Sequence, residues 1–238
     1  MPDYSLYWYP GTCARVPFVA LEEIGASFEP IFVDRMVDDP SLLEVNPKGR
    51  VPVLAADGRM ITEIPAIVFY LARRHPEAAL VPGDPVLEID ALETLSWLGA
   101  GVHSAVARLR WPSEYSDQSE DSDAIRAVAR RQLEQALSIV ERRLQDRDWL
   151  YGDWSIVDVH LQWVWFRAIG SGVDGSAYPR YAALAARCEE RPSVASVLDR
   201  EEQELARLGD AGKLPSDLPA YEAGRLPARD LARPEYMD

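Results

Sequence analysis

The stretch NPKGRVPVLAADGRMITEIPA, residues 46–66, carries most of the information about the first part of this chain. VPVL at 51–54 and RMIT at 59–62 have the length and the residue types of two short strands. Because the Asp57-Gly58 pair between them favours a tight turn, the stretch predicts a hairpin. A helix is predicted next, over 65–74, since proline costs no hydrogen bond in the first turn of a helix.

The residues ahead of this hairpin predict a β-α-β unit. Residues 5–8 and 28–33 are strand candidates, and between them residues 13–24 place apolar side chains at helical spacing and stop at Gly25. One helical turn over 42–45 then leads into the hairpin. The first 80 residues are therefore expected to fold as βαβ followed by ββα.

Beyond a proline-rich connection the strand signal is lost, and five segments have the apolar spacing of helices. They are Val86 to Leu109, Ala124 to Leu144, Ile156 to Ile169, Tyr181 to Cys188 and Val194 to Leu208. The predicted organisation is thus an α/β domain over 1–80, a linker over 81–85 and an all-helical domain over 86–208. Residues 209–238 contain spaced prolines and few large apolar residues, which predicts an extended or disordered tail.

Composition excludes several classes of partner. The formal net charge is −14, so nucleic acid and anionic lipid are repelled rather than attracted. No apolar run approaches the roughly 18 residues of a membrane span, and the first residues do not resemble a secretory signal. Two distant cysteines, Cys13 and Cys188, are expected to be reduced thiols of a cytoplasmic protein. Three scattered histidines predict no metal site.

The segment YPGTCARVPF, residues 9–18, places Cys13 between a turn and the start of a helix. The positive end of a helix stabilises a thiolate there, which would make the thiol reactive. A small buried cysteine that packs as a hydrophobe is the alternative. Position alone leaves both interpretations open.

Two further segments have a structural and a functional interpretation. Pro52 opens a strand, where a cis peptide bond would leave the backbone of Val51 free to pair with an extended peptide, or it is simply the proline of an edge strand. Glu63 precedes a helix whose N–H groups suit a carboxylate, while the Glu63 side chain suits an ammonium group. Its alternative role is compensation of the helix dipole.

Taken together, these segments resemble the glutathione transferase family, and most of all its bacterial beta class. The resemblance covers roughly residues 3–205 and rests on NPKGRVPVL and ITEIPAI together with YPGTCARVPFVALEEIG (9–25), GVHSAVARL (101–109), DWSIVDVHL (153–161) and YPRYAALAARCEERPSVASVL (178–198). It places Cys13 on the reactive cysteine of the class and His103 on a histidine that approaches this cysteine from the second domain. In DWSIVDVHL, Ser155 and Asp158 have the spacing of a capping box.

The resemblance implies a thioredoxin-like N-terminal domain that holds glutathione as cosubstrate. It also implies a helical domain that forms most of the pocket for a hydrophobic electrophile, and a homodimer. Val51 would pair with the cysteinyl part of glutathione and Pro52 would hold the cis turn. Glu63 and the backbone of Ile64 would face the γ-glutamyl end. Arg35 and Lys48 are further candidates for its carboxylates.

Two departures from the family pattern affect the expected chemistry. Ile64 stands where the family usually has a serine or threonine hydroxyl for the γ-glutamyl carboxylate, so glutathione binding is expected to be weaker. Trp8 stands where a catalytic tyrosine would be expected, with Tyr7 and Tyr9 on the other face of the strand. Cys13 is therefore the best candidate for the activating or nucleophilic group.

Three functions are compatible with these residues. The leading one is a glutathione transferase that conjugates glutathione to a hydrophobic electrophile or exchanges thiols with it through Cys13. The alternative is a non-catalytic module with the transferase fold, which binds an apolar ligand or a protein partner. A thioredoxin-type oxidoreductase is disfavoured because Pro10 occupies the position of a first cysteine in a Cys-x-x-Cys pair.

Overall fold

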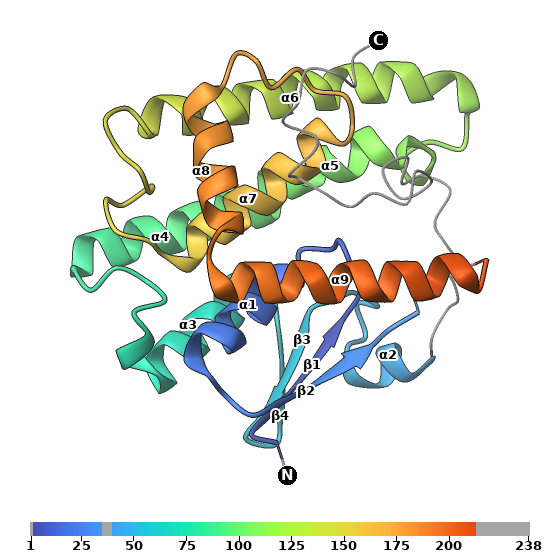
Figure 1. Ribbon diagram of the computed structural model, residues 1–238. Helices are drawn as coiled ribbons and strands as arrows, with labels where there is room; N and C mark the ends of the chain where they lie inside the picture. The colour runs from blue at the N-terminus through green and yellow to red at the C-terminus, as the bar shows by residue number, and fades with distance from the viewer. Residues whose placement is uncertain (1, 35–39, 213–238) are drawn as a thin grey trace.

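A computed structural model describes residues 2–34 and 40–212 of the chain, and it contains the two predicted units (Figure 1). The first unit is built on a four-stranded sheet in the order β2-β1-β3-β4. Its strands are β1 (Tyr4–Trp8), β2 (Phe28–Phe32), β3 (Val53–Ala56) and β4 (Arg59–Thr62). β1 pairs parallel with β2 and antiparallel with β3, which confirms the predicted βαβ-ββα order.

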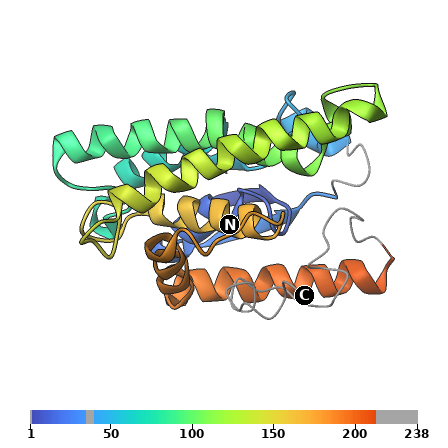
Figure 2. The same ribbon diagram turned by 90° about the horizontal axis from the view of Figure 1, so that it is seen from above.

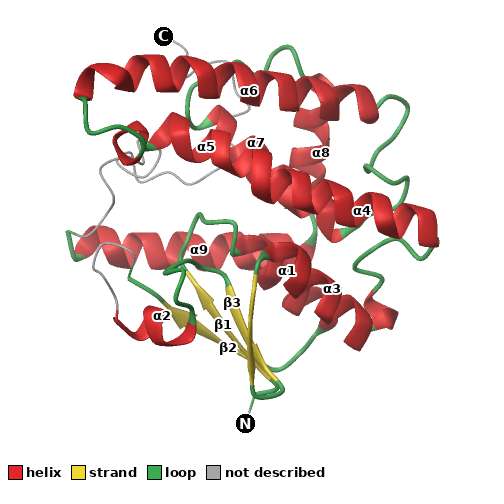
Figure 3. Ribbon diagram, turned by 180° about the vertical axis from the view of Figure 1, so that it is seen from behind, coloured by secondary structure: helices red, strands yellow, loops and turns green. Residues whose placement is uncertain are grey.

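The β3–β4 hairpin forms as the sequence predicts. Asp57 and Gly58 both have positive φ values, 50° and 70°, as a two-residue turn matched to the twist of a hairpin requires. Ahead of β3, the Val51–Pro52 peptide bond is cis, which confirms the prediction for Pro52. The end of the sheet at which β1 finishes with Trp8 and β3 begins with Val53 faces the helical unit (Figure 3).

The two faces of the sheet are covered by different helices. Leu6 and Trp8 of β1 lie in the main core with α1 (Arg15–Ile24) and α3 (Ile64–Arg74). Tyr7 packs on the opposite face in a smaller cluster with Leu42 of α2 (Pro40–Val45). This alternation is that of a strand buried on both sides.

Helix α1 begins two residues later than the sequence predicts. The N–H of Arg15 bonds to the carbonyl of Thr12 and that of Val16 to the carbonyl of Cys13, so residues 12–14 form tight turns rather than helix. Gly11, with φ of +69°, sets the direction of the chain just before these turns. The helix ends at Gly25 in the left-handed conformation, as predicted.

The second unit is all helical, as predicted (Figures 1 and 3). Its main helices are α4 (Pro85–Trp97), α5 (His103–Arg110), α6 (Ser122–Arg143), α7 (Ile156–Ile169), α8 (Pro179–Glu189) and α9 (Pro192–Asp210). Ser155 and Asp158 form the predicted capping box at the start of α7. No helix of the described ranges 2–34 and 40–212 is long and apolar enough to cross a membrane.

The prediction of one helix over 86–109 is corrected by the structure. A wider π-helical turn, Leu98–Val102, interrupts it and separates α4 from α5. Gly99 and Gly101 within this turn weaken the preference for a regular α-helix, because glycine has the lowest helix propensity of all residues except proline.

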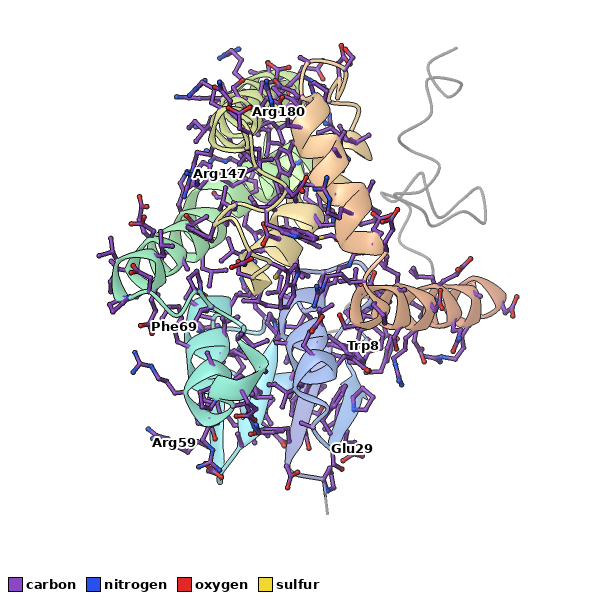
Figure 4. The ribbon with its side chains drawn as sticks, turned by 60° about the vertical axis from the view of Figure 1, so that its left-hand side comes forward. Trp8, Glu29, Arg59, Phe69, Arg147 and Arg180 are labelled. Atoms are coloured by element: carbon purple, nitrogen blue, oxygen red, sulfur yellow. The ribbon has the colours of Figure 1, made fainter. Side chains whose placement is uncertain are left out.

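The last described helix returns to the sheet unit. α9 runs across the molecule beside α1, on the opposite side from α4 and α6, with α7 between them (Figure 2). Figure 4 shows the labelled Trp8 and Glu29 in the sheet unit, whereas the labelled Arg147 and Arg180 lie in the upper helical unit. Residues 209 and 210 of the predicted tail belong to α9, and residues 213–238 lie outside the described part. The predicted domain boundaries themselves stay a prediction.

Two charged contacts fix α9 against α1. The Arg15 guanidinium donates to both carboxylate oxygens of Glu201, at 3.2 and 2.6 Å, and both side chains are completely buried. Arg191, just ahead of α9, donates to Glu23 at the other end of α1. A salt bridge buried this deeply ties together segments 186 residues apart.

Candidate functional site

A cavity of about 240 Å³ opens where the two units meet. One side is formed by the turn that carries Cys13 and by the 48–51 segment ahead of β3. The other side is formed by α5, by the residues after it and by α7. The cavity therefore includes Cys13, Lys48, Val51 and His103 among the residues predicted for the site.

Cys13 lines this cavity and is 6% exposed. Thr12 shapes the turn before it, because its hydroxyl donates to the Tyr9 carbonyl at 2.6 Å and accepts from the Ala14 N–H at 3.3 Å. The thiol thus sits two residues before α1, near the positive end of that helix. This placement is compatible with thiolate chemistry.

His103 is the first residue of α5 and reaches the cavity from the helical unit. Its ring packs against the ring of Trp163 on α7, with centroids 4.8 Å apart. The cavity thus brings together the cysteine and the histidine that the sequence analysis singled out, although they are 90 positions apart in the chain.

The 46–51 segment forms the second part of the sheet-side wall. Asn46 is 2% exposed; its side-chain amide donates to the Arg50 carbonyl at 2.6 Å, and its oxygen accepts from the Lys48 N–H at 3.2 Å. These contacts curl the segment so that Lys48, Arg50 and Val51 all line the cavity. Val51 lies just outside the β3 ladder, next to the cis bond.

Lys48 connects the cavity to Glu63. Its ammonium group donates to a Glu63 carboxylate oxygen at 2.5 Å and to the Thr62 hydroxyl at 2.7 Å. The Lys48 and Glu63 side chains are 50% and 70% exposed. Glu63 has a φ of +71° immediately before α3, a backbone conformation that residues other than glycine rarely adopt.

The remaining predicted residues lie elsewhere. Pro52 and Ile64 do not line the cavity, and the Ile64 side chain is buried in the core at the first position of α3. Arg35 falls outside the described residues. Among the described residues, no group of three or more histidine, cysteine, aspartate or glutamate side chains could hold a metal ion.

Trp163 and Arg167 are among the residues of the helical wall that sequence reasoning missed. Both line the cavity, and both donate to the carbonyl of Gly11 in the turn ahead of Cys13. A signal for Arg167 exists in the run IVDVHLQWVWFRAI, where Asp158, His160, Gln162 and Arg167 are the polar residues of a mostly apolar helix. Polar side chains at such positions are rarely buried unless they bond to a specific group.

Access to the cavity separates the two cysteines and the two histidines of the region. Cys188 is fully buried, and this burial raises the pKa of its thiol well above the ordinary range. Burial, with a smaller contribution from nearby His103, lowers the pKa of His160 to about 3. Neither ring nitrogen of His160 has a hydrogen-bond partner in the described part of the chain. Cys13 and His103, by contrast, both reach the cavity.

Comparisons with known proteins agree with one another. The family model "Glutathione S-transferase, N-terminal domain" matches residues 2–73. Glutathione S-transferase GstA of Escherichia coli O157:H7 is 31% identical over 208 residues, which are 83% of this chain and 98% of that protein.

Two solved structures have the same arrangement of both units. A glutathione transferase homologue from Sulfitobacter with bound glutathione is 31% identical, with a TM-score of 0.78, over 84% of this chain and 99% of the other. The bacterial beta class glutathione S-transferase of Sphingomonas chungbukensis is 33% identical, with a TM-score of 0.72, over 83% and 98%.

Proposed function

Because this chain belongs to the glutathione S-transferase family, we propose that it binds glutathione as cosubstrate in the cavity between its two units and transfers it to a hydrophobic electrophile. One observation carries the proposal for the site. Cys13 and Val51, next to a cis proline, form one side of the same cavity that His103 reaches from the other side.

Glutathione would lie along the sheet-side wall. The Val51 backbone pairs with its cysteinyl part, and Pro52 keeps the turn open for that pairing. Lys48 and Glu63 form the charged end of the sheet-side wall. There, Glu63 faces the γ-glutamyl ammonium group and the start of α3 at Ile64 faces the γ-glutamyl carboxylate. Arg35 is a further candidate for a carboxylate contact. The glutathione sulfur would then lie against Cys13.

In conjugation, the glutathione thiolate attacks an electrophilic carbon, a new carbon–sulfur bond forms and the leaving group departs with its electron pair. In thiol exchange, the Cys13 thiolate attacks one sulfur of a disulfide and the other sulfur leaves as a thiolate. Both reactions need a thiolate near neutral pH. The start of α1 and the imidazole of His103 are the groups that would favour it.

Alkylation of the two cysteines tests this placement directly. A small alkylating reagent should modify Cys13 much faster than Cys188, because Cys188 is buried and its pKa is raised. Saturating glutathione should slow the reaction of Cys13 and leave Cys188 unchanged. Equal rates for the two cysteines, with no protection by glutathione, would exclude Cys13 from the site.

A non-catalytic binding module is the second candidate, and Ile64 favours it. The missing hydroxyl at this position removes a hydrogen bond to a charged group, which corresponds to about one to two powers of ten in affinity. Retention on immobilised glutathione without turnover of a generic aryl halide would support the module. Turnover that depends on glutathione supports the enzyme.

We also propose a homodimer in the cytoplasm. Val86 and Ile89 on α4 are 70% and 63% exposed, and Met60 on β4 is 49% exposed, which leaves apolar side chains available for a second copy. Light scattering at micromolar concentration should give twice the mass of one chain. The mass of a single chain would contradict this part of the proposal.

A further inference from the structure

The Gly11 carbonyl receives two donors from the same helix of the other unit. The indole N–H of Trp163 donates to it at 3.1 Å, and the guanidinium of Arg167 donates to the same oxygen. Gly11 is two residues before Cys13, and its φ of +69° makes it the point where the chain turns toward the thiol. Helix α7 therefore holds the backbone of the turn that carries Cys13.

Trp163 makes a second contact that matters for the same cavity. Its ring packs against His103, with centroids 4.8 Å apart, and the Trp163 side chain is 2% exposed. One rigid side chain thus touches the Cys13 turn through its N–H and His103 through its ring face. The relative position of the thiol and the imidazole depends on where this indole lies.

Helix α7 is itself firmly placed. Its first turn is closed by the capping box of Ser155 and Asp158, and Gln162 accepts a hydrogen bond from Arg15 at 2.9 Å at the start of α1. The helix that holds the turn is thereby attached to the helix that follows the turn. Little freedom is left for the segment between them.

Trp165 shows what a purely structural tryptophan looks like on the same helix. It is 6% exposed and packs against Tyr181 of α8, with ring centroids 5.2 Å apart. It does not line the cavity. The two tryptophans have similar burial, and only Trp163 contacts residues proposed for the reaction.

We propose that Trp163 and Arg167 are positioning residues of the transferase reaction, which together hold the Gly11 carbonyl and set the Cys13 turn against His103. This inference rests on the function proposed above. Neither residue needs to touch the reacting atoms. Their shared acceptor makes a specific prediction, because either donor alone can still satisfy the carbonyl and the loss of both leaves it buried without a donor from α7.

A double-mutant cycle in the full chain tests the shared acceptor. Trp163→Phe and Arg167→Met should each lower kcat about threefold to tenfold, and the double variant should lower kcat by more than the product of the two measured single effects. KM for glutathione should change by less than about twofold in Trp163→Phe. The matched control Trp165→Phe should leave kcat unchanged, and thermal melts of each variant show whether it is folded.

The pH profile of Cys13 alkylation provides a readout that needs no turnover. The charged and titratable groups around the cavity are Lys48, Arg50, His103, Glu114 and Arg167, and all are retained in Trp163→Phe. A rise in the midpoint of that profile in Trp163→Phe, absent in Trp165→Phe, would thus reflect changed geometry rather than changed charge.

The outcomes separate the two proposals. A wild-type chain without any glutathione-dependent turnover would overturn the proposed function, and the alkylation midpoints would still test the positioning role. If Trp163→Phe matches Trp165→Phe in both kcat and midpoint, the positioning role is wrong. Should the double variant fail to fold, Trp163→Phe alone against its control remains decisive.

Discussion

The wall of the cavity formed by residues 46–51 and the wall formed by α7 differ in how they are held. On the first wall, Lys48 and its partner Glu63 are half or more exposed to solvent, and one buried amide, Asn46, shapes the segment. On the second wall, Trp163 and Arg167 are buried and donate to backbone inside the molecule.

This difference separates recognition from support. Exposed ion pairs contribute little to stability, so residues such as Lys48 remain free to exchange one charged contact for another when a ligand arrives. Buried polar groups are costly to leave without a hydrogen bond, so the α7 wall keeps its geometry whether or not a ligand is bound. The chain adapts on one side of the cavity and holds the reactive turn from the other.

The largest effect is expected when the buried salt bridge between Arg15 and Glu201 is broken. Glu201→Ala leaves the Arg15 guanidinium buried without its carboxylate, which should lower the free energy of unfolding by about 3–5 kcal/mol. Denaturant unfolding measures this change. The matched control is Glu204→Ala on the same helix, which removes a partly exposed pair with Arg207 and should cost less than about 1 kcal/mol.

Replacing both buried partners would sharpen the result. In Arg15→Met with Glu201→Leu neither charge of this pair remains, so most of the lost stability should return. A double variant as unstable as Glu201→Ala would show that apolar packing, rather than the uncompensated charge, accounts for the loss.

A pH dependence should follow from His160, a buried residue of α7 itself. Its pKa is lowered to about 3 by burial, below the ordinary 6.5, so its contribution to stability is present above pH 6.5 and is lost as pH falls toward 3. Between pH 7 and pH 5 this loss is about 2 kcal/mol. It should vanish in His160→Phe.

Asp158 acts in the opposite direction over the same range. Burial raises its pKa to about 6, so the folded protein binds a proton there as pH falls below 6. The cost of burying the ionised carboxylate is then removed, and the free energy of unfolding rises. The wild-type change between pH 7 and pH 5 should therefore be smaller than the His160 contribution alone. The measurement is the difference in unfolding free energy between wild type and His160→Phe at both pH values, and an equal difference at the two would contradict it.

On the wall formed by residues 46–51, a substitution of Asn46 should have an intermediate effect on stability. Asn46→Ala removes two backbone contacts that curl the 46–51 segment, which should cost about 1–2 kcal/mol of stability and weaken glutathione binding. Calorimetry with glutathione measures the second effect. Alkylation of Cys13 without glutathione should stay at the wild-type rate, because the α7 wall is untouched; a change in that rate would show that the two walls are coupled.

The smallest effect on stability is expected for Lys48→Met. Removal of its exposed pair with Glu63 should change the unfolding free energy by about 0–1 kcal/mol. Glutathione affinity should fall more than stability does. A loss of stability as large as that of Asn46→Ala would mean that the pair supports the fold rather than the ligand.

The local features of the fold could be predicted from the sequence because short-range chemistry specifies them. Asp57-Gly58 set the hairpin turn, and Ser155 with Asp158 predicted the cap of α7, whereas the cis bond at Pro52 was one of two interpretations until the family resemblance favoured it. Of the candidate site, the neighbourhood of Cys13 and His103 followed from the family resemblance rather than from spacing.

The remaining features depend on contacts between distant segments. No local pattern pairs Arg15 with Glu201, because each is an ordinary charged residue on its own helix until the two are buried together. The π-helical turn at Leu98–Val102 was missed because the apolar spacing on both sides continues across it. Trp163 looked like any core aromatic, since its N–H acceptor is 152 positions away.

The attachment of α9 to α1 has a consequence for the order in which the protein is made. The sheet unit leaves the ribosome first, but Glu201 follows Arg15 by 186 residues, which at typical rates of synthesis is roughly 10 to 40 seconds. During that interval the surface of α1 that α9 covers in the finished protein is open to water and to chaperones. A nascent chain halted before residue 192 should therefore be cleaved by protease at α1 much faster than the finished protein.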